Sequence, residues 1–290
     1  MEPTQDQPDD QPAPPPGGWR EKWHSLTRGQ REVALYFLIG LSPAIYFVLD
    51  SSIDLWGAQL GHTRNFGYPT SYEPFWLGVR RVIQFCTALL PILVAYSVYC
   101  RVAKGKHRFG LDGKAAAYLL LCVIVGPWLL ANEVLKDNWG RPRPAHLDVT
   151  IGTKQYAPPL LIDDQCDKNC SFISGEASFG YIWVALAFVP AFMHRRRQLF
   201  IFGLGIGTVA GIMRIYQGGH FPSDVWYAAL FMIATAWGLH KLFYETEWPD
   251  RAAPAARRIS ASGFEALRAG TLLIARAAKR ARDRLRRGDW

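Results

Sequence analysis

The strongest constraint on this chain is an alternation of apolar runs, each about 20 residues long, with segments that carry most of the charge. A run of that length can cross a bilayer as an α-helix, in which the backbone polar groups pair within the segment. Half of the 290 residues are hydrophobic. Soluble proteins reach that proportion too, so the grouping into runs is the deciding observation. It predicts an all-α membrane protein.

The runs predict a bundle of six transmembrane helices. We expect them at about 33–49, 76–99, 115–135, 177–193, 199–215 and 222–244. Basic residues set their orientation, because cytoplasmic segments are rich in Lys and Arg. The N-terminal flank, the loop 101–114, the turn Arg195–Arg197 and the C-terminal tail are basic. Both termini are therefore expected inside. The loops 50–72, 136–174 and 216–222 then face outward, which in a bacterium is the periplasm.

Two terminal segments flank the predicted membrane domain at 31–246. Residues 1–30 begin with an acidic, Pro-rich stretch and are expected to be a disordered tail, with no signal peptide. Residues 247–290 carry much of the excess behind the net charge of +9. We expect them to form a basic amphipathic helix on the inner membrane surface. Nucleic-acid binding is the less favoured explanation of this charge.

Cys166 and Cys170 lie in an outward loop as C-D-K-N-C. An oxidising compartment would allow a disulfide between them. A metal site is less favoured, because no nearby His or Cys completes a set of ligands.

The segment Arg214–Asp224, R-I-Y-Q-G-G-H-F-P-S-D, places ionisable groups at a membrane edge. Such groups are expensive to hold there, so they indicate function. Two glycines permit a tight turn, and Pro222 suits the first turn of a helix. The carboxylate of Asp224 could then accept the imidazole N–H of His220. That bond would leave the other ring nitrogen free as a nucleophile.

Two further segments are expected at the same face. S-F-I-S-G-E-A-S places Ser174 and Gly175 at a helix start, where a hydroxyl and free N–H groups can bind an anion. Ser174 could also be a simple N-cap. K-D-N-W-G-R-P-R-P supplies Lys136 and Arg143 as cations for phosphate oxygens, while Arg141 between them is expected to face solvent.

Together these groups suit a phosphoryl site. In-line attack by His220 would give a phosphohistidine, with Lys136, Arg143 and Arg214 stabilising the phosphate oxygens. The leaving alcohol needs a proton, and Glu176 is the nearest titratable candidate. Partial burial would let Glu176 act as an acid. Neighbouring cations would instead keep it ionised, to orient a cation or the attacking water.

The three segments resemble the type 2 phosphatidic acid phosphatase family, which shares its catalytic core with vanadium haloperoxidases and bacterial acid phosphatases. The resemblance covers about residues 30–245. The family pattern is K-x6-R-P, then P-S-G-H, then S-R-x5-H-x3-D. Its matches here are Lys136, Arg143 and Pro144, then Ser174 and Gly175, then Arg214, His220 and Asp224.

The resemblance implies a six-helix membrane phosphatase that requires no metal or other cofactor. His220 would be the nucleophile and Asp224 would orient it. The phosphate-binding residues would be Lys136, Arg143, Ser174 and Arg214. Three positions depart from the pattern: Ile173 for Pro, Met213 for Ser, and Glu176 for the His that usually protonates the leaving group.

The leading hypothesis is an integral membrane lipid phosphatase of the outer leaflet. Lipid A phosphate and polyprenyl diphosphate are the favoured substrates, because a diphosphate or a sugar 1-phosphate departs with less protonation than a simple alcohol. A glycerophospholipid phosphate is a further candidate. The alternatives are a lipid phosphotransferase with the same first half-reaction and a lipid-binding scaffold that lost turnover with Glu176. A transporter is disfavoured, because no internal repeat is visible. No protein partner is implied.

Overall fold

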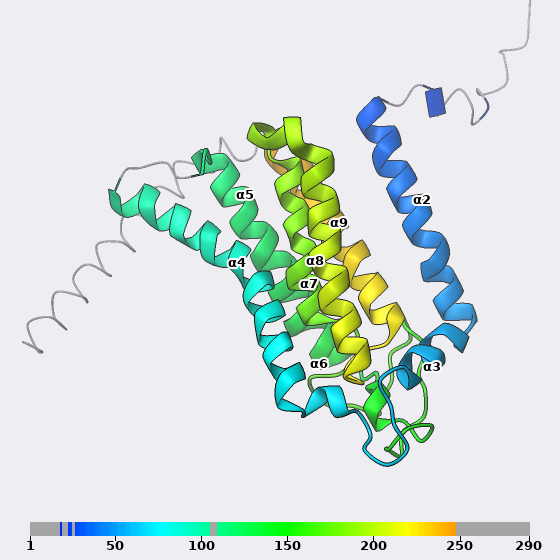
Figure 1. The fold of residues 1–290 in the computed structure, drawn as a ribbon. Helices are drawn as coiled ribbons and strands as arrows, with labels where there is room; N and C mark the ends of the chain where they lie inside the picture. Colours follow the sequence, from blue (N-terminus) through cyan, green and yellow to red (C-terminus); the bar gives the residue numbers. More distant parts are fainter. Residues whose placement is uncertain (1–17, 19–22, 25–26, 105–108, 248–290) are drawn as a thin grey trace, which may run out of the picture. The chain divides into compact units, whose positions relative to one another are not determined.

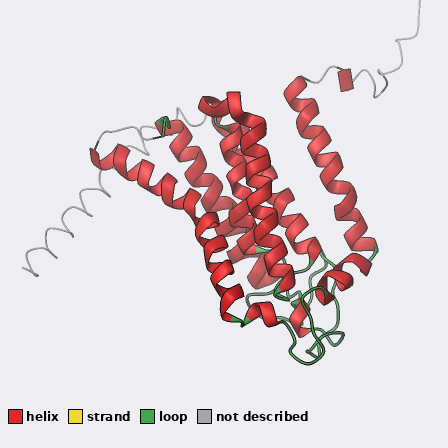
Figure 2. Ribbon diagram, in the orientation of Figure 1, coloured by secondary structure: helices red, strands yellow, loops and turns green. Residues whose placement is uncertain are grey.

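The structure is a computed structural model, and it describes residues 18, 23–24, 27–104 and 109–247. All regular elements among these residues are helices (Figure 2). The described residues form no strand and only two isolated β-bridges. The prediction of an all-α fold is confirmed for this part of the chain. The predicted C-terminal surface helix lies outside the described residues, as does most of the N-terminal tail.

The chain divides into two units, residues 1–46 and 47–290. Helix α2, Arg28–Leu49, begins in the first unit and contains the first predicted span. The second unit holds the remaining helices (Figure 1). These are α3 (Ser52–Gln59), η1 (Pro69–Ser71), α4 (Pro74–Lys104), α5 (Gly113–Val123), η2 (Ile124–Leu135), α6 (Lys136–Asn138), η3 (Pro144–His146), α7 (Gly175–Tyr181), η4 (Ile182–Phe188), η5 (Pro190–Arg195), α8 (Arg196–Tyr216) and α9 (Pro222–Tyr244).

Three helical runs in the described part of the chain are long and apolar enough to cross a membrane, at Pro74–Arg101, Gly113–Asn138 and Pro190–Tyr216. They contain the second, third and fifth predicted spans. The sixth predicted span coincides with α9, and the fourth is divided among α7, η4 and η5. The number of six spans and the side of each terminus stay predictions.

The run Gly113–Asn138 changes its helical geometry before it reaches the site. Pro127 lies inside the run and has no N–H to donate, and here the α-helix gives way to the wider π-helix η2. The side-chain amide of Asn132 donates to the Pro127 carbonyl at 2.5 Å. Its amide oxygen accepts a hydrogen bond from Lys136 Nζ at 3.1 Å. The irregular turn thus supports the first cation of the site.

Close packing of α7 against α8 depends on glycine. A Cβ on Gly207 would lie 2.2 Å from the ring of Tyr181, and one on Gly180 would lie 2.5 Å from the Gly207 Cα. Small residues let helix backbones approach in this way in membrane bundles. The contact brings the start of α7 beside the end of α8, where the predicted site residues lie.

The segment 50–72 was expected to be a polar loop, but it contains helix α3 and the short η1. Thr70 Oγ1 donates to the carbonyl of Tyr216 at 2.5 Å, and Gln217 Nε2 donates to the Thr70 carbonyl at 3.0 Å. These bonds attach the segment to the end of α8. As a result α3 lies at the same end of the second unit as α6 and the turn before α9 (Figure 1).

Candidate active site

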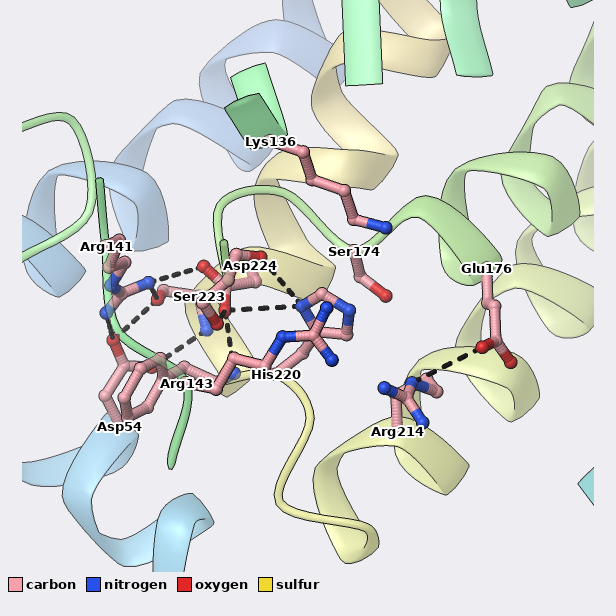
Figure 3. Close-up of polar contacts among 12 residues, drawn as sticks. Asp54, Lys136, Arg141, Arg143, Ser174, Glu176, Arg214, His220, Ser223 and Asp224 are labelled. Atoms are coloured by element: carbon pink, nitrogen blue, oxygen red, sulfur yellow. Dashed lines mark hydrogen bonds and ion pairs between the residues drawn. The ribbon is translucent and has the colours of Figure 1, made fainter. Parts of the chain in front are cut away.

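The three predicted segments meet at one end of the second unit. Figure 3 shows Lys136, Arg143 and Ser174 around the ring of His220, with Arg214 and Glu176 facing one another to one side. They come from the end of the run Gly113–Asn138, the loop after it, the start of α7, the end of α8 and the turn before α9.

His220 is held as a neutral ring with one free nitrogen. Its Nδ1 lies 2.7 Å from the carbonyl oxygen of Ser171. A carbonyl only accepts, so Nδ1 carries the proton and Nε2 keeps its lone pair. The side chain is 2% exposed. Burial lowers the pKa of His220 to about 4, and the opposing effect of Asp224 is smaller. Near neutral pH, Nε2 can therefore act as a nucleophile.

Asp224 orients His220 less directly than the sequence suggested. Its Oδ2 lies 3.7 Å from Nδ1 of His220, beyond hydrogen-bond distance. Oδ2 instead accepts from the hydroxyl of Ser171 and from the N–H of Phe221. Asp224 thus fixes Ser171, and the Ser171 carbonyl in turn fixes the tautomer of the histidine.

The prediction that Arg141 faces solvent was wrong, because its side chain is completely buried. Its guanidinium donates to Asp224 Oδ1 at 2.5 Å, to Asp54 Oδ2 at 2.7 Å and to the Ala157 carbonyl at 2.9 Å. Asp54 also accepts from the N–H of Ser223 at 2.9 Å. Arg141 therefore joins α3, the 139–174 loop and the first turn of α9.

The charges in this buried network support one another. Burial works against the charge of Arg141, but Asp224 and Asp54 outweigh it and raise its pKa. The Tyr156 hydroxyl donates to Asp54 Oδ2 at 3.0 Å. Burial and the Asp54 charge raise the pKa of Tyr156, so it stays a donor. The network is a rigid support behind His220.

Each of the three predicted cations donates hydrogen bonds to one neighbouring residue. Arg143 Nη2 donates to the carbonyl and the side-chain oxygen of Asn169, at 2.7 Å in each case. Arg214 Nη1 donates to Gln217 Oε1 at 2.6 Å. Lys136 is held by Asn132 as described above. A guanidinium has five N–H groups, so both arginines keep donors for an anion.

The disulfide loop holds Arg143 in place. Cys166 and Cys170 are joined by a disulfide. Between them, the backbone N–H of Asn169 donates to Asp137 Oδ1 at 3.0 Å. The N–H of Cys170 donates to the Lys136 carbonyl at 3.0 Å. The loop therefore lies along the segment that carries two of the cations.

Ser174 has a buried hydroxyl with no hydrogen-bond partner among the described residues. Ser174 occupies the N-cap position of α7, as the alternative interpretation placed it, but its side chain makes no capping hydrogen bond there. Leaving a buried hydroxyl unpaired costs about 1–3 kcal/mol. Its position beside Lys136 and His220 suits donation to an anionic oxygen (Figure 3).

Glu176 lies between two arginines. Arg80 on α4 donates to it from Nε at 3.2 Å and also from Nη2, and Arg214 Nε lies 3.5 Å from Glu176 Oε1. Two guanidinium groups favour the ionised carboxylate, which accepts protons but has none to donate. Of the two roles considered for Glu176, this geometry supports orientation of a cation.

A neutral histidine among three cations, at one end of a bundle with apolar helices, is a site suited to phosphoryl transfer. Comparison with known sequences makes this class more specific. The profile of the PAP2 superfamily matches residues 115–248. The chain belongs to this superfamily, and membership places it among phosphatases that hydrolyse phosphoric monoesters. The resemblance seen in the three sequence segments is thereby confirmed.

Three curated relatives are named Lipid A 4'-phosphatase. The chain is 38% identical to the one from Francisella tularensis subsp. novicida (strain U112) over 162 residues, which is 55% of this chain and 70% of the relative. It is 38% identical to that of Rhizobium leguminosarum over 154 residues, 50% of this chain and 65% of the relative. For Rhizobium etli the identity is 37% over 116 residues, 39% of this chain and 44% of the relative. No solved structure matches the chain significantly.

Proposed function

We propose that the chain is a lipid phosphatase of the bacterial inner membrane that removes the 4'-phosphate of lipid A at the periplasmic face. The names of its relatives support this substrate over polyprenyl diphosphate. The observation that carries the chemistry is His220. Its Nδ1 proton is held by the Ser171 carbonyl, and its Nε2 is left free among Lys136, Arg143 and Arg214.

The first half-reaction forms a phosphohistidine. The lone pair on Nε2 of His220 forms a bond to phosphorus while the bond between phosphorus and the sugar oxygen breaks. That oxygen leaves with the bonding electron pair and takes a proton from water. Lys136, Arg143 and Arg214 stabilise the charge on the three remaining phosphate oxygens, and the Ser174 hydroxyl donates to one of them.

The second half-reaction releases phosphate. A water oxygen forms a bond to phosphorus, and the bond to Nε2 breaks with its electron pair returning to His220. The proton lost by that water balances the one taken by the sugar oxygen. Asp224 and Ser171 keep the Nδ1 proton in place throughout, so the ring begins and ends as the same tautomer.

The test is release of inorganic phosphate by the purified protein in detergent with EDTA. The substrates are lipid A with both phosphates, lipid A with only the 1-phosphate or the 4'-phosphate, a polyprenyl diphosphate and a phosphatidic acid. We expect phosphate from the two lipids that carry the 4'-phosphate and none from the 1-phosphate species. Loss of activity on EDTA treatment would contradict the mechanism.

Two variants make the assay specific. His220→Ala should abolish release, because it removes the nucleophile. His194→Ala removes an exposed histidine in η5, outside the three segments, and should leave the rate unchanged. Transfer of phosphate to an added lipid alcohol would identify a phosphotransferase. Lipid binding without turnover on any substrate would identify a scaffold.

A further inference from the structure

Arg80 reaches the site from a helix that carries no part of the three sequence segments. It lies near the start of α4, and its Nε and Nη2 donate to Glu176. Its side chain is 29% exposed and that of Glu176 is 21% exposed, so the pair lies at the edge of the site. Nη1 of Arg80 makes no hydrogen bond to any described residue. One donor-bearing nitrogen is therefore available.

Glu176 offsets only part of the positive charge around it. Its carboxylate contacts Arg80 and Arg214, and Lys136 and Arg143 complete the group of cations. Burial lowers the pKa of Arg143, and the nearby charge of Arg80 adds to this effect. The four cations repel one another, and a single carboxylate offsets only part of this repulsion. A phosphate monoester dianion would relieve that repulsion.

We propose that Arg80 is a substrate-binding residue and the fourth cation of the site. Glu176 holds the guanidinium of Arg80 so that the free Nη1 of Arg80 is directed to the phosphate group. The inference rests on the proposed function, since it assigns the ligand of the same site. A guanidinium bound through Nε and Nη2 keeps a fixed plane, so its remaining nitrogen has a fixed position. Glu176 is then a positioning residue that acts through Arg80 and Arg214.

This assignment explains why a carboxylate can stand at a position where the family pattern has His. The position no longer supplies a proton and instead adds a cation to the phosphate site. The site thus loses an acid that could protonate the leaving group, and it gains a cation that stabilises the phosphate oxygens. The ligand that suits this group of cations is a phosphate monoester with two negative charges.

The experiment measures phosphate binding separately from turnover. The full chain is purified in detergent, and its melting temperature is followed as inorganic phosphate is added, because a ligand that binds the folded state stabilises it. KM and kcat for the lipid phosphate, and the inhibition constant of inorganic phosphate, are measured on the same samples. The variants are Arg80→Gln, Arg80→Lys and Glu176→Gln.

Arg81→Gln is the matched control. It makes the same change of charge at the next residue of α4, where the side chain is exposed and has no ion pair with a described residue. We expect Arg80→Gln to raise KM and the inhibition constant of phosphate by about tenfold, the effect of one charge-assisted hydrogen bond. Arg80→Lys should recover part of the loss, and Arg81→Gln should behave as the unmodified protein.

Glu176→Gln separates positioning from acid catalysis. If Glu176 positions Arg80, this variant should weaken phosphate binding, and adding it to Arg80→Gln should have little further effect. A loss confined to kcat, with unchanged phosphate binding, would overturn the inference. So would unchanged phosphate binding in Arg80→Gln.

Folding and function are kept apart by design. If Arg80→Gln melts at a much lower temperature than the unmodified protein without phosphate, Arg80→Lys is used in its place. Unchanged phosphate binding by Arg80→Lys would then overturn the inference. If the unmodified protein binds phosphate but hydrolyses no lipid, the proposed function fails while Arg80 is still tested. If phosphate does not raise its melting temperature at all, the assignment of Arg80 is overturned.

Discussion

At the scale of single residues, one proton decides which atom can attack phosphorus. The Ser171 carbonyl holds the proton of His220 on Nδ1, and Asp224 holds Ser171. The carboxylate is therefore one step removed from the ring. Its effect on the nucleophile passes through a backbone group whose position depends on the loop before α7.

The buried ring predicts an unusual pH dependence. The pKa of His220 is lowered from 6.5 to about 4, so Nε2 loses its lone pair only as the pH falls through that lower value. We expect kcat/KM, corrected for ionisation of the substrate phosphate, to stay level from pH 7 to about 5 and to fall below that. A decline centred near 6.5 would show that the ring titrates as an exposed histidine.

Arg141 predicts a large effect on stability. Arg141→Ala would leave Asp54 and Asp224 buried without their cation, so the free energy of unfolding should fall by about 3–5 kcal/mol. Arg64→Ala removes an exposed arginine from the segment that follows α3 and serves as the control. Unfolding in detergent measures both. Equal stability of the two variants would contradict the structural role given to Arg141.

Residues close to a motif could be placed from the sequence, and distant partners could not. Lys136, Ser174 and His220 were found because spacing and residue type are local properties. Tertiary packing places Asp54 and Arg80 at the site. The sequence predicted only a polar loop around Asp54 and the end of a helix at Arg80. A buried Arg141 cannot be told from a solvated one until its two carboxylates are known.

At the scale of elements, glycine on α8 sets how closely two helices approach. Gly207→Ala would place a methyl group 2.2 Å from Tyr181, and this overpacking should cost about 1–3 kcal/mol of stability. Gly205→Ala, on the same helix, meets no atom within 4 Å and should be neutral or slightly stabilising. Melting temperatures in detergent compare the two. A Gly207→Ala variant as stable as Gly205→Ala would contradict the packing argument.

Helix bounds followed closely from hydrophobicity where a run was long and uninterrupted. The sixth predicted span and α9 coincide at 222–244. The fourth predicted span breaks into shorter pieces around Pro190, and the eight-residue α3 was missed. Short helices have too few residues for a clear period, so packing rather than pattern determines them.

At the scale of the whole molecule, the orientation in the membrane is a prediction from charge. Fusions of alkaline phosphatase, which is active only in the periplasm, should be active after Gly61 and Leu160 and inactive after Gly110. The reason is the distribution of Lys and Arg between the predicted loops. Fusions of a fluorescent protein that matures in the cytoplasm should give the opposite pattern. Activity after Gly110 would reverse the proposed face of the site.

The central claim is that His220 carries the phosphoryl group during turnover. The direct measurement mixes the protein with lipid A labelled with ³²P at the 4'-phosphate. It stops the reaction within milliseconds in alkali, where phosphohistidine survives, and locates the label by peptide mapping. The account predicts label on His220 and none in His220→Ala. Turnover without any labelled protein, or label on a different residue, would contradict it.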